Sequence, residues 1–318
     1  MLYLSEADVA GASIPLERLR DVIAGAFAAQ GNGRAEAAPK SVMSIATGHV
    51  FQAKPAVLRD AGLAGMKWFG LVPSNQTSGP SISSLIVLSD LKTGEMLAVM
   101  GGNSITATRT AAMSAIAAQH LARQDSKSIG FVGCGVQAHS HLEALRLVLP
   151  ALDRVVACSR TQASAERLVD AARALGLQAS TTREPRTAVE GMDVVITSVP
   201  EDTAVLEFLD TTWLAPGAFA SAVDLGRSWR RDTLRKVELL ATDEHEQTRT
   251  LAAMGRMSFA GPYEADLTDL VTGAHPGRSS AEQRALFVFS GHALADLAAA
   301  QVVYETAKRQ GLGVELPR

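Results

Sequence analysis

The stretch Ser128-Ile129-Gly130-Phe131-Val132-Gly133-Cys134-Gly135-Val136-Gln137-Ala138 decides the fold of this chain. A short apolar run leads into a Gly-x-Gly-x-x-Ala turn, and an amphipathic helical pattern over His139–Leu149 follows directly. In this order the N–H groups of a helix N-terminus face a pyrophosphate, and glycines stand where a Cβ would block its approach. The stretch therefore predicts dinucleotide binding. The residues expected at the cofactor are Gly133, Gly135, Val136, Gln137 and Ala138.

Residues 129–243 alternate between strand and helix patterns. Apolar strands that alternate with helices indicate a parallel sheet covered on both faces. We therefore predict an α/β chain with a Rossmann-type, doubly wound parallel sheet. The expected strands are Ile129–Val132, Arg154–Ser159, Leu177–Thr181, Asp193–Thr197, Ala218–Val223 and Val237–Ala241, with helices in the gaps, the clearest over Ser164–Leu175.

The regions before and after this core have a mixed pattern. They are expected to supply the substrate site, because the last helix can return to the N-terminal part. The expected elements are helices over Pro15–Gln30, Thr106–Arg123 and Gly291–Gln310, extended runs over Ser41–Ala46, Val50–Gln52, Met66–Leu71, Ser84–Ser89 and Ala285–Phe289, a hairpin turn over Asp90–Gly94 and a loop-rich stretch over 254–284.

The composition is that of a globular protein of 318 residues, with 47% hydrophobic residues and a formal net charge of −3. This charge gives no support for a nucleic-acid or membrane-surface partner. The chain shows no long apolar run and no basic, apolar leader, so a cytoplasmic protein is expected. Cys134 and Cys158 are interpreted as small buried hydrophobes, and the seven histidines lack metal-ligand spacing, so no metal is expected.

The choice between the two nicotinamide dinucleotides depends on the end of the second expected strand. A carboxylate there would hold the ribose 2′-OH of NAD. The sequence instead has Ser159-Arg160-Thr161, a cation with two hydroxyl donors. This favours NADP(H), with NAD(H) possible, because an exposed arginine that stacks on the adenine would tolerate either cofactor.

Two basic residues of the N-terminal part are candidates for binding a carboxylate. Arg109 lies in the first turn of a predicted helix, where the dipole prefers an anion, and its forked guanidinium can hold a carboxylate bidentately. Lys67 interrupts an apolar run, so it points into a cleft or pairs with an acid. For Arg109 the alternative is a surface arginine that pairs with a neighbouring acid. Lys40 and Gln52 are weaker candidates.

Asp224 follows the expected strand Ala218–Val223. It would lie at the carboxyl edge of the parallel sheet, where open α/β sheets bind ligands. There it is a candidate proton donor or acceptor, and the alternative is a loop aspartate that caps a turn.

The chain resembles the ornithine cyclodeaminase/mu-crystallin family over nearly its whole length. The resemblance rests on several separated motifs in the same order as in the family. These are Gly65–Trp68, Pro73–Asn75, Val87–Gly94, Thr106–Ala112 (TATRTAA), Gly130–Ala138 and the segment Ser290–Asp296.

The resemblance implies a Rossmann domain over 113–291 and a discontinuous α+β substrate-binding and dimerisation domain over 1–112 with 292–318. It also implies a homodimer and a carboxylate held by Lys67 and Arg109, with Lys40 assisting. The remaining residues that it places at the substrate or cofactor are Gln52, Asn75, Ser81, Thr197, Ser198, Val199, Val223, Leu225, Ser290 and Gly291.

Two departures bear on the reaction. Cyclodeaminases of the family carry an aspartate where this chain has Gly226, and a glutamate where it has Gln52. Both changes weaken a reaction on ornithine and leave the carboxylate-binding residues in place. We therefore expect an NAD(P)H-dependent reductase of a small α-imino or cyclic ketimine acid, such as a pyrroline-2-carboxylate or an iminodicarboxylate. The alternatives are an ornithine cyclodeaminase that recycles NAD and a non-catalytic mu-crystallin-like binding protein.

Overall fold

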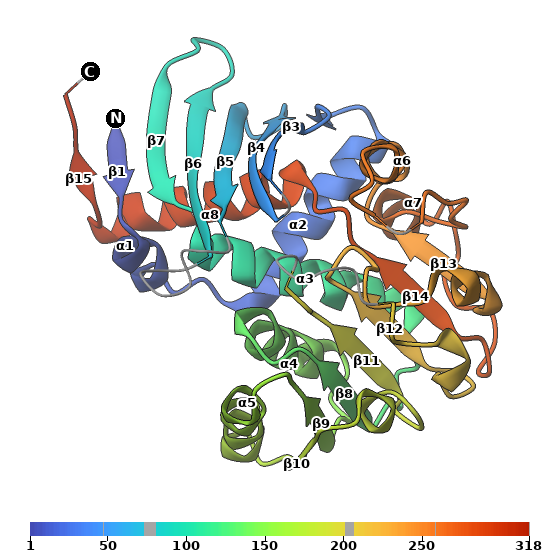
Figure 1. Cartoon of the computed structure of the whole chain (residues 1–318). Helices are drawn as coiled ribbons and strands as arrows, with labels where there is room; N and C mark the ends of the chain where they lie inside the picture. Colours follow the sequence, from blue (N-terminus) through green and yellow to red (C-terminus); the bar gives the residue numbers. More distant parts are fainter. Residues whose placement is uncertain (47, 73–80, 201–206, 258, 318) are drawn as a thin grey trace. The chain divides into compact units, whose positions relative to one another are not determined.

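The computed structural model describes residues 1–46, 48–72, 81–200, 207–257 and 259–317 (Figure 1). The chain divides into two compact units. The first unit comprises Met1–Arg109 and His292–Arg318, and the second comprises Thr110–Gly291. The domain limits expected from the sequence, at 112/113 and 291/292, stay a prediction. None of the described helices combines the length and the apolar character that a membrane crossing requires.

An eight-stranded mixed sheet forms the centre of the first unit. Its order is β15-β1-β7-β6-β5-β4-β2, and β3 pairs with β4. The β1–β7 pair is parallel, and the other neighbours are antiparallel. The strands are β1 (Leu2–Leu4), β2 (Ala35–Ala37), β3 (Ser41–Ala46), β4 (His49–Leu58), β5 (Leu63–Leu71), β6 (Ile82–Asp90), β7 (Met96–Gly101) and β15 (Val314–Glu315).

Strand β4 is much longer than the expected run Val50–Gln52. Lys54 and Pro55 hide its second half in the sequence, because a charged residue followed by proline argues against a central strand. In the structure the side chains of β4 alternate strictly, with one face buried and the other half-buried. Lys54 lies on the buried face.

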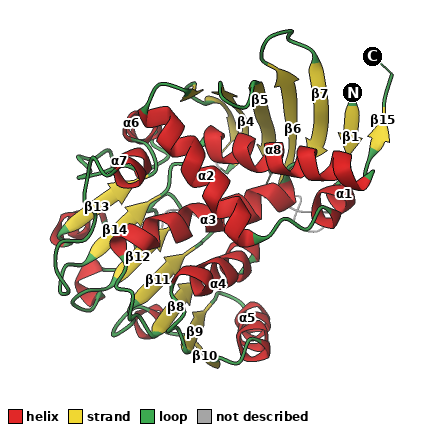
Figure 2. Cartoon of the chain, turned by 180° about the vertical axis from the view of Figure 1, so that it is seen from behind, coloured by secondary structure: helices red, strands yellow, loops and turns green. Residues whose placement is uncertain are grey.

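Helix α8 (Ala293–Gln310) covers the buried face of this sheet, packing against β4, β5 and β6 (Figures 1 and 2). It begins two residues later than expected, because His292 is the N-cap and accepts a hydrogen bond from the N–H of Leu294. Gly65 on β5 allows the close approach, since a Cβ there would lie 2.5 Å from Cδ1 of Leu297. The close packing brings residues of α8 against side chains of β5.

Three more helices belong to or begin in the first unit. Helix α1 (Glu6–Gly11) starts with a capping box of Ser5 and Asp8, and α2 (Leu16–Gly31) packs against α8. Helix α3 (Asn103–Leu121) begins in the first unit and continues into the second.

The second unit contains a parallel seven-stranded sheet of order β10-β9-β8-β11-β12-β14-β13. The order reverses between β8 and β11, as in a doubly wound sheet, which confirms the predicted Rossmann-type fold. Its strands are β8 (Ser128–Val132), β9 (Arg154–Cys158), β10 (Gln178–Thr182), β11 (Val194–Thr197), β12 (Phe219–Ala222), β13 (Leu239–Thr242) and β14 (Ala285–Val288).

The helices of the second unit differ in part from the prediction. Helices α4 (Val136–Val148) and α5 (Gln162–Ala174) follow β8 and β9 as expected. Short 3₁₀ turns stand in three later gaps where α-helices were expected: Pro185–Ala188, Thr211–Trp213 and Arg231–Lys236. The loop-rich stretch 254–284 contains α7 (Leu267–Thr272), and α6 (His245–Ala253) precedes it.

Gly130, Cys134 and Cys158 lie in tightly packed parts of the second unit. A Cβ at Gly130 would overlap the carbonyl oxygen of Ala188, so the 3₁₀ turn can lie directly on the strand. Cys134 and Cys158 are buried free thiols, as the sequence predicted. Burial raises the pKa of Cys134 to about 12, so this thiol is unreactive at neutral pH.

Candidate active site

The Gly-x-Gly turn lies at the point where the strand order of the second unit reverses. Gly133 adopts φ +91, and a Cβ there would lie only 2.6 Å from the carbonyl oxygen of Ser198. Ser198 Oγ in turn donates to the carbonyl of Gly133 over 3.0 Å. The turns after β8 and β11 are therefore in direct contact, and glycine is the residue that fits this position.

Helix α4 begins beside open space. Gly135 is its N-cap and provides no side-chain cap, and no heavy atom lies within 4 Å of a Cβ built on it. Val136, the first helical residue, is 72% exposed. The uncapped N–H groups of a first turn attract an anion, so this end of α4 fits the pyrophosphate of a dinucleotide. Gln137 and Ala138 belong to the same turn.

Arg160 and Thr161 are exposed just beyond the end of β9. Thr161 is the N-cap of α5, and its hydroxyl donates to Ser164 Oγ over 2.8 Å. Within the described residues Arg160 forms no ion pair, so its guanidinium is accessible to an anionic ligand. The arrangement fits both expected roles of Arg160, binding of a 2′-phosphate and stacking on the adenine.

Asp224 holds together the loops that follow β11 and β12. Its carboxylate accepts hydrogen bonds from the hydroxyls of Thr197 and Ser228, at 3.1 and 2.7 Å, and from the N–H of Val199 at 3.4 Å. Burial raises the pKa of Asp224, although these hydrogen bonds oppose the change. The contacts support the alternative that Asp224 organises a loop, and its role in proton transfer stays a prediction. Val223 and Leu225 flank it, Leu225 at φ +62.

Ser290 and Gly291 lie after β14, with their backbone donors already engaged. Asp243 accepts from both N–H groups, at 2.7 and 2.6 Å, and from the Ser290 hydroxyl at 2.5 Å. Gln247 donates to the carbonyl of Gly291. These bonds fix the segment, and its expected contact with the cofactor stays a prediction.

In the first unit, Lys67 and Arg109 meet at one carboxylate. Lys67 Nζ lies 2.6 Å from Oδ1 of Asp296 and donates to Thr106 Oγ1 over 3.2 Å. Arg109 Nε lies 2.7 Å from the same Oδ1. All three side chains are almost fully buried, with exposed fractions of 5% or less. We call Lys67, Arg109 and Asp296 the Asp296 ion cluster.

Burial and charge act against each other in this cluster. Burial alone would raise the pKa of Asp296, but the positive charges of Arg109 and Lys67 lower it to about 2. Burial lowers the pKa of Lys67 well below that of an ordinary lysine, and Arg109 and Lys54 act in the same direction. Asp296 is therefore a carboxylate at every physiological pH, and its buried Oδ2 has no hydrogen-bond partner among the described residues.

The predicted position of Arg109 in the first turn of a helix was wrong. Helix α3 begins at Asn103, so Arg109 lies in its second turn and outside the reach of the free N-terminal N–H groups. Glu6 already caps this end, accepting from the N–H groups of Asn103 and Ser104 at 2.7 and 3.1 Å. The burial of Arg109 and its ion pair with Asp296 are the observations that indicate a site here.

The other candidates of the first unit are placed differently. Gln52 lies on β4 opposite Phe69 and is 2% exposed, on the sheet face that also carries Lys67. Lys40, just before β3, is 6% exposed. Ser81 lines a pocket of about 290 Å³ with Phe51 and Trp68, and its expected place at the cofactor stays a prediction. Asn75 lies outside the described residues.

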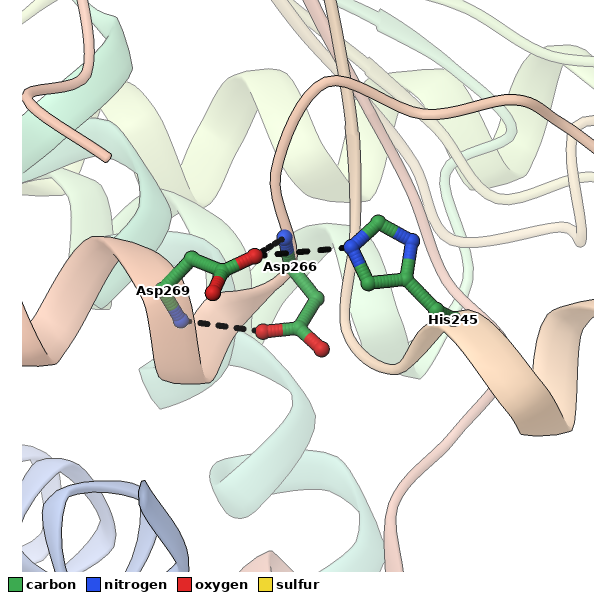
Figure 3. A group of neighbouring side chains, drawn as sticks. All are labelled: His245, Asp266 and Asp269. Atoms are coloured by element: carbon green, nitrogen blue, oxygen red, sulfur yellow. Dashed lines mark hydrogen bonds and ion pairs between the residues drawn. The ribbon is translucent and has the colours of Figure 1, made fainter. Parts of the chain in front are cut away.

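A further polar group of the second unit contains His245, Asp266 and Asp269 (Figure 3). Their potential ligand atoms lie within 4.8 Å of one another. Asp266 and Asp269 form the capping box of α7, and His245 Nε2 lies 3.4 Å from Asp269 Oδ2. The capping box accounts for the positions of the two aspartates, and His245 contacts one of them.

Two residues of the first unit, Asp296 and Lys54, are not among the site residues predicted from the sequence. Asp296 belongs to a motif that supported the family resemblance, but it was not assigned to the site. An acid inside the alanine-rich run 293–300 was the available signal, because a charge within an apolar helix needs a partner. Lys54 was missed because its strand was not recognised.

Comparisons with known proteins identify the family of the chain. The sequence profile described as "Ornithine cyclodeaminase/mu-crystallin family" matches residues 2–311. The chain belongs to this family. Alanine dehydrogenase of Archaeoglobus fulgidus is 30% identical over 95% of this chain and 94% of its own length.

Two solved structures are similar over whole chains. One is a Δ1-pyrroline-2-carboxylate reductase of Thermococcus litoralis in complex with NADH and L-proline. It is 28% identical with a TM-score of 0.90, covering 99% of this chain and 100% of its own. The other is an archaeal alanine dehydrogenase dimer with bound NAD. It is 28% identical with a TM-score of 0.89, covering 100% and 99%.

Proposed function

We propose that this chain is an NAD(P)H-dependent reductase of a small α-imino or cyclic ketimine carboxylic acid, or in reverse an amino acid dehydrogenase. The observation that carries the proposal is the Asp296 ion cluster, with two buried cations and one buried acceptor in the first unit. The family members described above include a reductase and a dehydrogenase of such substrates.

In this proposal the cations bind the substrate carboxylate. Arg109 has N–H groups beyond the Nε that faces Asp296, and its planar fork can hold a carboxylate bidentately. Lys67, which pairs with the same carboxylate of Asp296, adds a second positive charge. Together they fix the orientation of the imine carbon, and orientation of this kind contributes several kcal/mol to catalysis.

Asp296 suits the other end of an imino acid. Its Oδ2 is a buried acceptor with no hydrogen-bond partner among the described residues, and a protonated imine is a donor. A bound nicotinamide would supply the hydride for the imine carbon. The C=N π electrons would pass to the nitrogen, which already carries the proton, and the oxidised dinucleotide would be left. Asp296 stabilises the protonated imine before this step.

The second unit would hold the dinucleotide at the start of α4, with Gly133 and Gly135 giving access to the pyrophosphate. We propose that Arg160 and Thr161 bind a 2′-phosphate, so that NADP(H) is preferred and NAD(H) possible. An ornithine cyclodeaminase is not proposed, because Gln52 and Gly226 replace its two acids.

We also propose a cytoplasmic homodimer. Several large apolar side chains of the first sheet are exposed on the face opposite α8, including Met43 (48%), Trp68 (38%) and Leu85 (44%). An apolar sheet face of this kind is typical of an interface. Size-exclusion chromatography with light scattering tests the dimer, and a monomeric mass would contradict it.

A panel of 2-oxo acids with ammonium and of preformed cyclic imines, followed by the absorbance of NADPH or NADH, tests the activity. We expect Arg109→Ala to lower kcat/KM by about 100-fold or more while the affinity for dinucleotide stays the same. Arg59→Ala, on an exposed arginine of the same unit, is the matched control. Unchanged kinetics of Arg109→Ala would remove this residue from the site. Ammonia release from ornithine without net NADH would indicate a cyclodeaminase, and tight dinucleotide binding with no turnover a binding protein.

A further inference from the structure

Three polar side chains meet in the apolar interior of the second unit. Residues 111–118 of α3 are all buried, and Ser114 is the polar one among them. His141 on α4 and Ser221 on β12 are also fully buried. Nε2 of His141 lies 2.9 Å from Oγ of Ser114, which lies 2.9 Å from Oγ of Ser221. We call these three side chains the His141 network, and it joins a strand and two helices at one point.

The hydrogen-bond partners assign the protons of the His141 network. Nδ1 of His141 lies 2.7 Å from the carbonyl oxygen of Gln137, one turn earlier on α4. A carbonyl only accepts, so Nδ1 carries a hydrogen, and Nε2 of a neutral ring is then an acceptor. Ser114 therefore donates to His141 and accepts from Ser221. The hydrogen bonds run in one direction, from the sheet through α3 to the backbone of α4.

Each member of the network lies near a part of the proposed site. Gln137 belongs to the first turn of α4, the proposed position of the pyrophosphate. Ser114 follows Arg109 by five residues on the same helix, α3. Ser221 lies on β12, three residues before Asp224. His141 thus connects the start of α4 with the helix that carries Arg109 and with the strand that leads to Asp224.

Folding stability does not require a histidine at this position. A hydrogen bond between neutral groups contributes little net stability, and apolar groups of similar shape can replace buried polar partners at almost no cost. Hydrogen bonds have a direction that apolar contacts lack, so a fully bonded buried network specifies one arrangement of the packed elements. The His141 network is therefore suited to keep the start of α4 in register with α3.

We propose that His141 is a positioning residue for hydride transfer. It holds the first turn of α4, and with it the bound dinucleotide, in a fixed position relative to α3, on which Arg109 would bind the substrate carboxylate. This inference rests on the proposed function. A misplacement of about 1 Å can lower the rate of a reaction about 100-fold. Loss of His141 should therefore reduce kcat while both ligands still bind.

Steady-state kinetics of α4 variants test this role. We expect His141→Leu to lower kcat for imine reduction by about 10-fold or more, with the KM of the imine and the Kd of the dinucleotide within about 3-fold of wild type. His141→Gln should recover part of kcat, because an amide offers a donor and an acceptor. His139→Leu is the matched control. The side chain of His139 is partly exposed and forms no hydrogen bond with other described residues, so kcat should stay at the wild-type value.

Stability measurements separate positioning from a structural role. The triple variant Ser114→Ala/His141→Leu/Ser221→Ala removes the whole network, so its Tm should be close to that of wild type while its kcat stays low. It also replaces His141→Leu if the single variant does not fold. A Tm well below wild type with an unchanged kcat would assign the network to folding. Equal losses of kcat in the Leu and Gln variants, or a loss of dinucleotide affinity as large as the loss of kcat, would also overturn the inference.

Binding calorimetry distinguishes failure of this inference from failure of the proposed function. If the wild-type protein reduces no imine, the reductase function fails, and titrations with NADP⁺ and 2-oxobutanoate still test His141. Bound NADP⁺ should raise the wild-type affinity for 2-oxobutanoate by about 5-fold or more, because each ligand binds best to one arrangement of α3 and α4. His141→Leu should lose this gain and bind each ligand alone as wild type does. No gain in wild type, or an equal gain in both proteins, would overturn the inference.

Discussion

The two units present different kinds of binding chemistry. The second unit presents backbone: a glycine turn at Gly133 and the uncapped N-terminus of α4 beside Gly135. The first unit presents charged side chains, with Lys67, Arg109 and Asp296 buried together on β5, α3 and α8. A backbone site depends on conformation and close approach, whereas a side-chain site depends on charge balance. Substitutions in the two units should therefore fail in different ways.

The largest effect is expected from removing the carboxylate of the first unit. Asp296→Asn keeps the shape but leaves Lys67 and Arg109 without their shared partner. Breaking a buried pair costs about 3–5 kcal/mol, so urea unfolding should show a marked loss of stability. The kcat/KM for imine reduction should fall by at least about 100-fold. If the affinity for dinucleotide falls as much as kcat/KM, the ion cluster of the first unit and the dinucleotide site of the second unit do not act independently.

A change in the second unit should have the opposite pattern. Gly133→Ala forces a left-handed residue whose Cβ would strike the carbonyl of Ser198, at a cost of about 3 kcal/mol in stability. Dinucleotide affinity should fall with it, measured by fluorescence titration. Gly176→Ala is the matched control, because its φ is +81 but no atom lies within 4 Å, so about 1 kcal/mol is expected. Equal effects of the two substitutions would contradict the role of close approach.

Acid should weaken the first unit in particular. The pKa of Asp296 is about 2 in the folded chain, below the ordinary value of 3.8. The stabilisation is complete above pH ~4 and is lost as the pH falls toward ~2, because the unfolded chain takes up the proton first. A shift of this size corresponds to about 2 kcal/mol. Denaturation curves at several pH values should show a steeper acid loss for wild type than for Asp296→Asn.

The smallest expected effect concerns the choice of dinucleotide. Arg160→Ala removes an exposed cation at the end of β9 and should weaken NADPH by about 10-fold relative to NADH. Calorimetric titration with each reduced dinucleotide measures the ratio. An equal loss for both would indicate that Arg160 stacks on the adenine and does not bind a 2′-phosphate.

The second unit was the easier one to predict from the sequence. The turn at Gly133 and the start of α4 are contiguous in the chain, and each parallel strand is a separate apolar run. The 3₁₀ turns at Pro185–Ala188 and Thr211–Trp213 were not predicted, because short connections carry too little periodicity to be told from helices.

The first unit was harder because its contacts are distant in sequence. Lys67 was expected to meet an acid or a cleft, but the acid lies 229 residues away, and no local pattern indicates such a pairing. Lys54 was hidden by the following Pro55, which made the second half of β4 resemble a loop. The cap formed by Glu6 likewise joins residues 97 positions apart. The positions of these side chains therefore depend on contacts between charged and polar groups that are distant in sequence, more than on local secondary-structure propensity.

The glycine at position 65 has a consequence for the order of events during synthesis. It lets α8 pack tightly on a sheet whose strands β1 to β7 leave the ribosome long before residues 293–310 do. Until that last segment emerges, the nascent chain carries an uncovered apolar sheet face. The charges of Lys67 and Arg109 also lack their partner Asp296 during this time. The N-terminal half must then wait for the C-terminal end, so a chain truncated near residue 291 would need a chaperone to stay soluble.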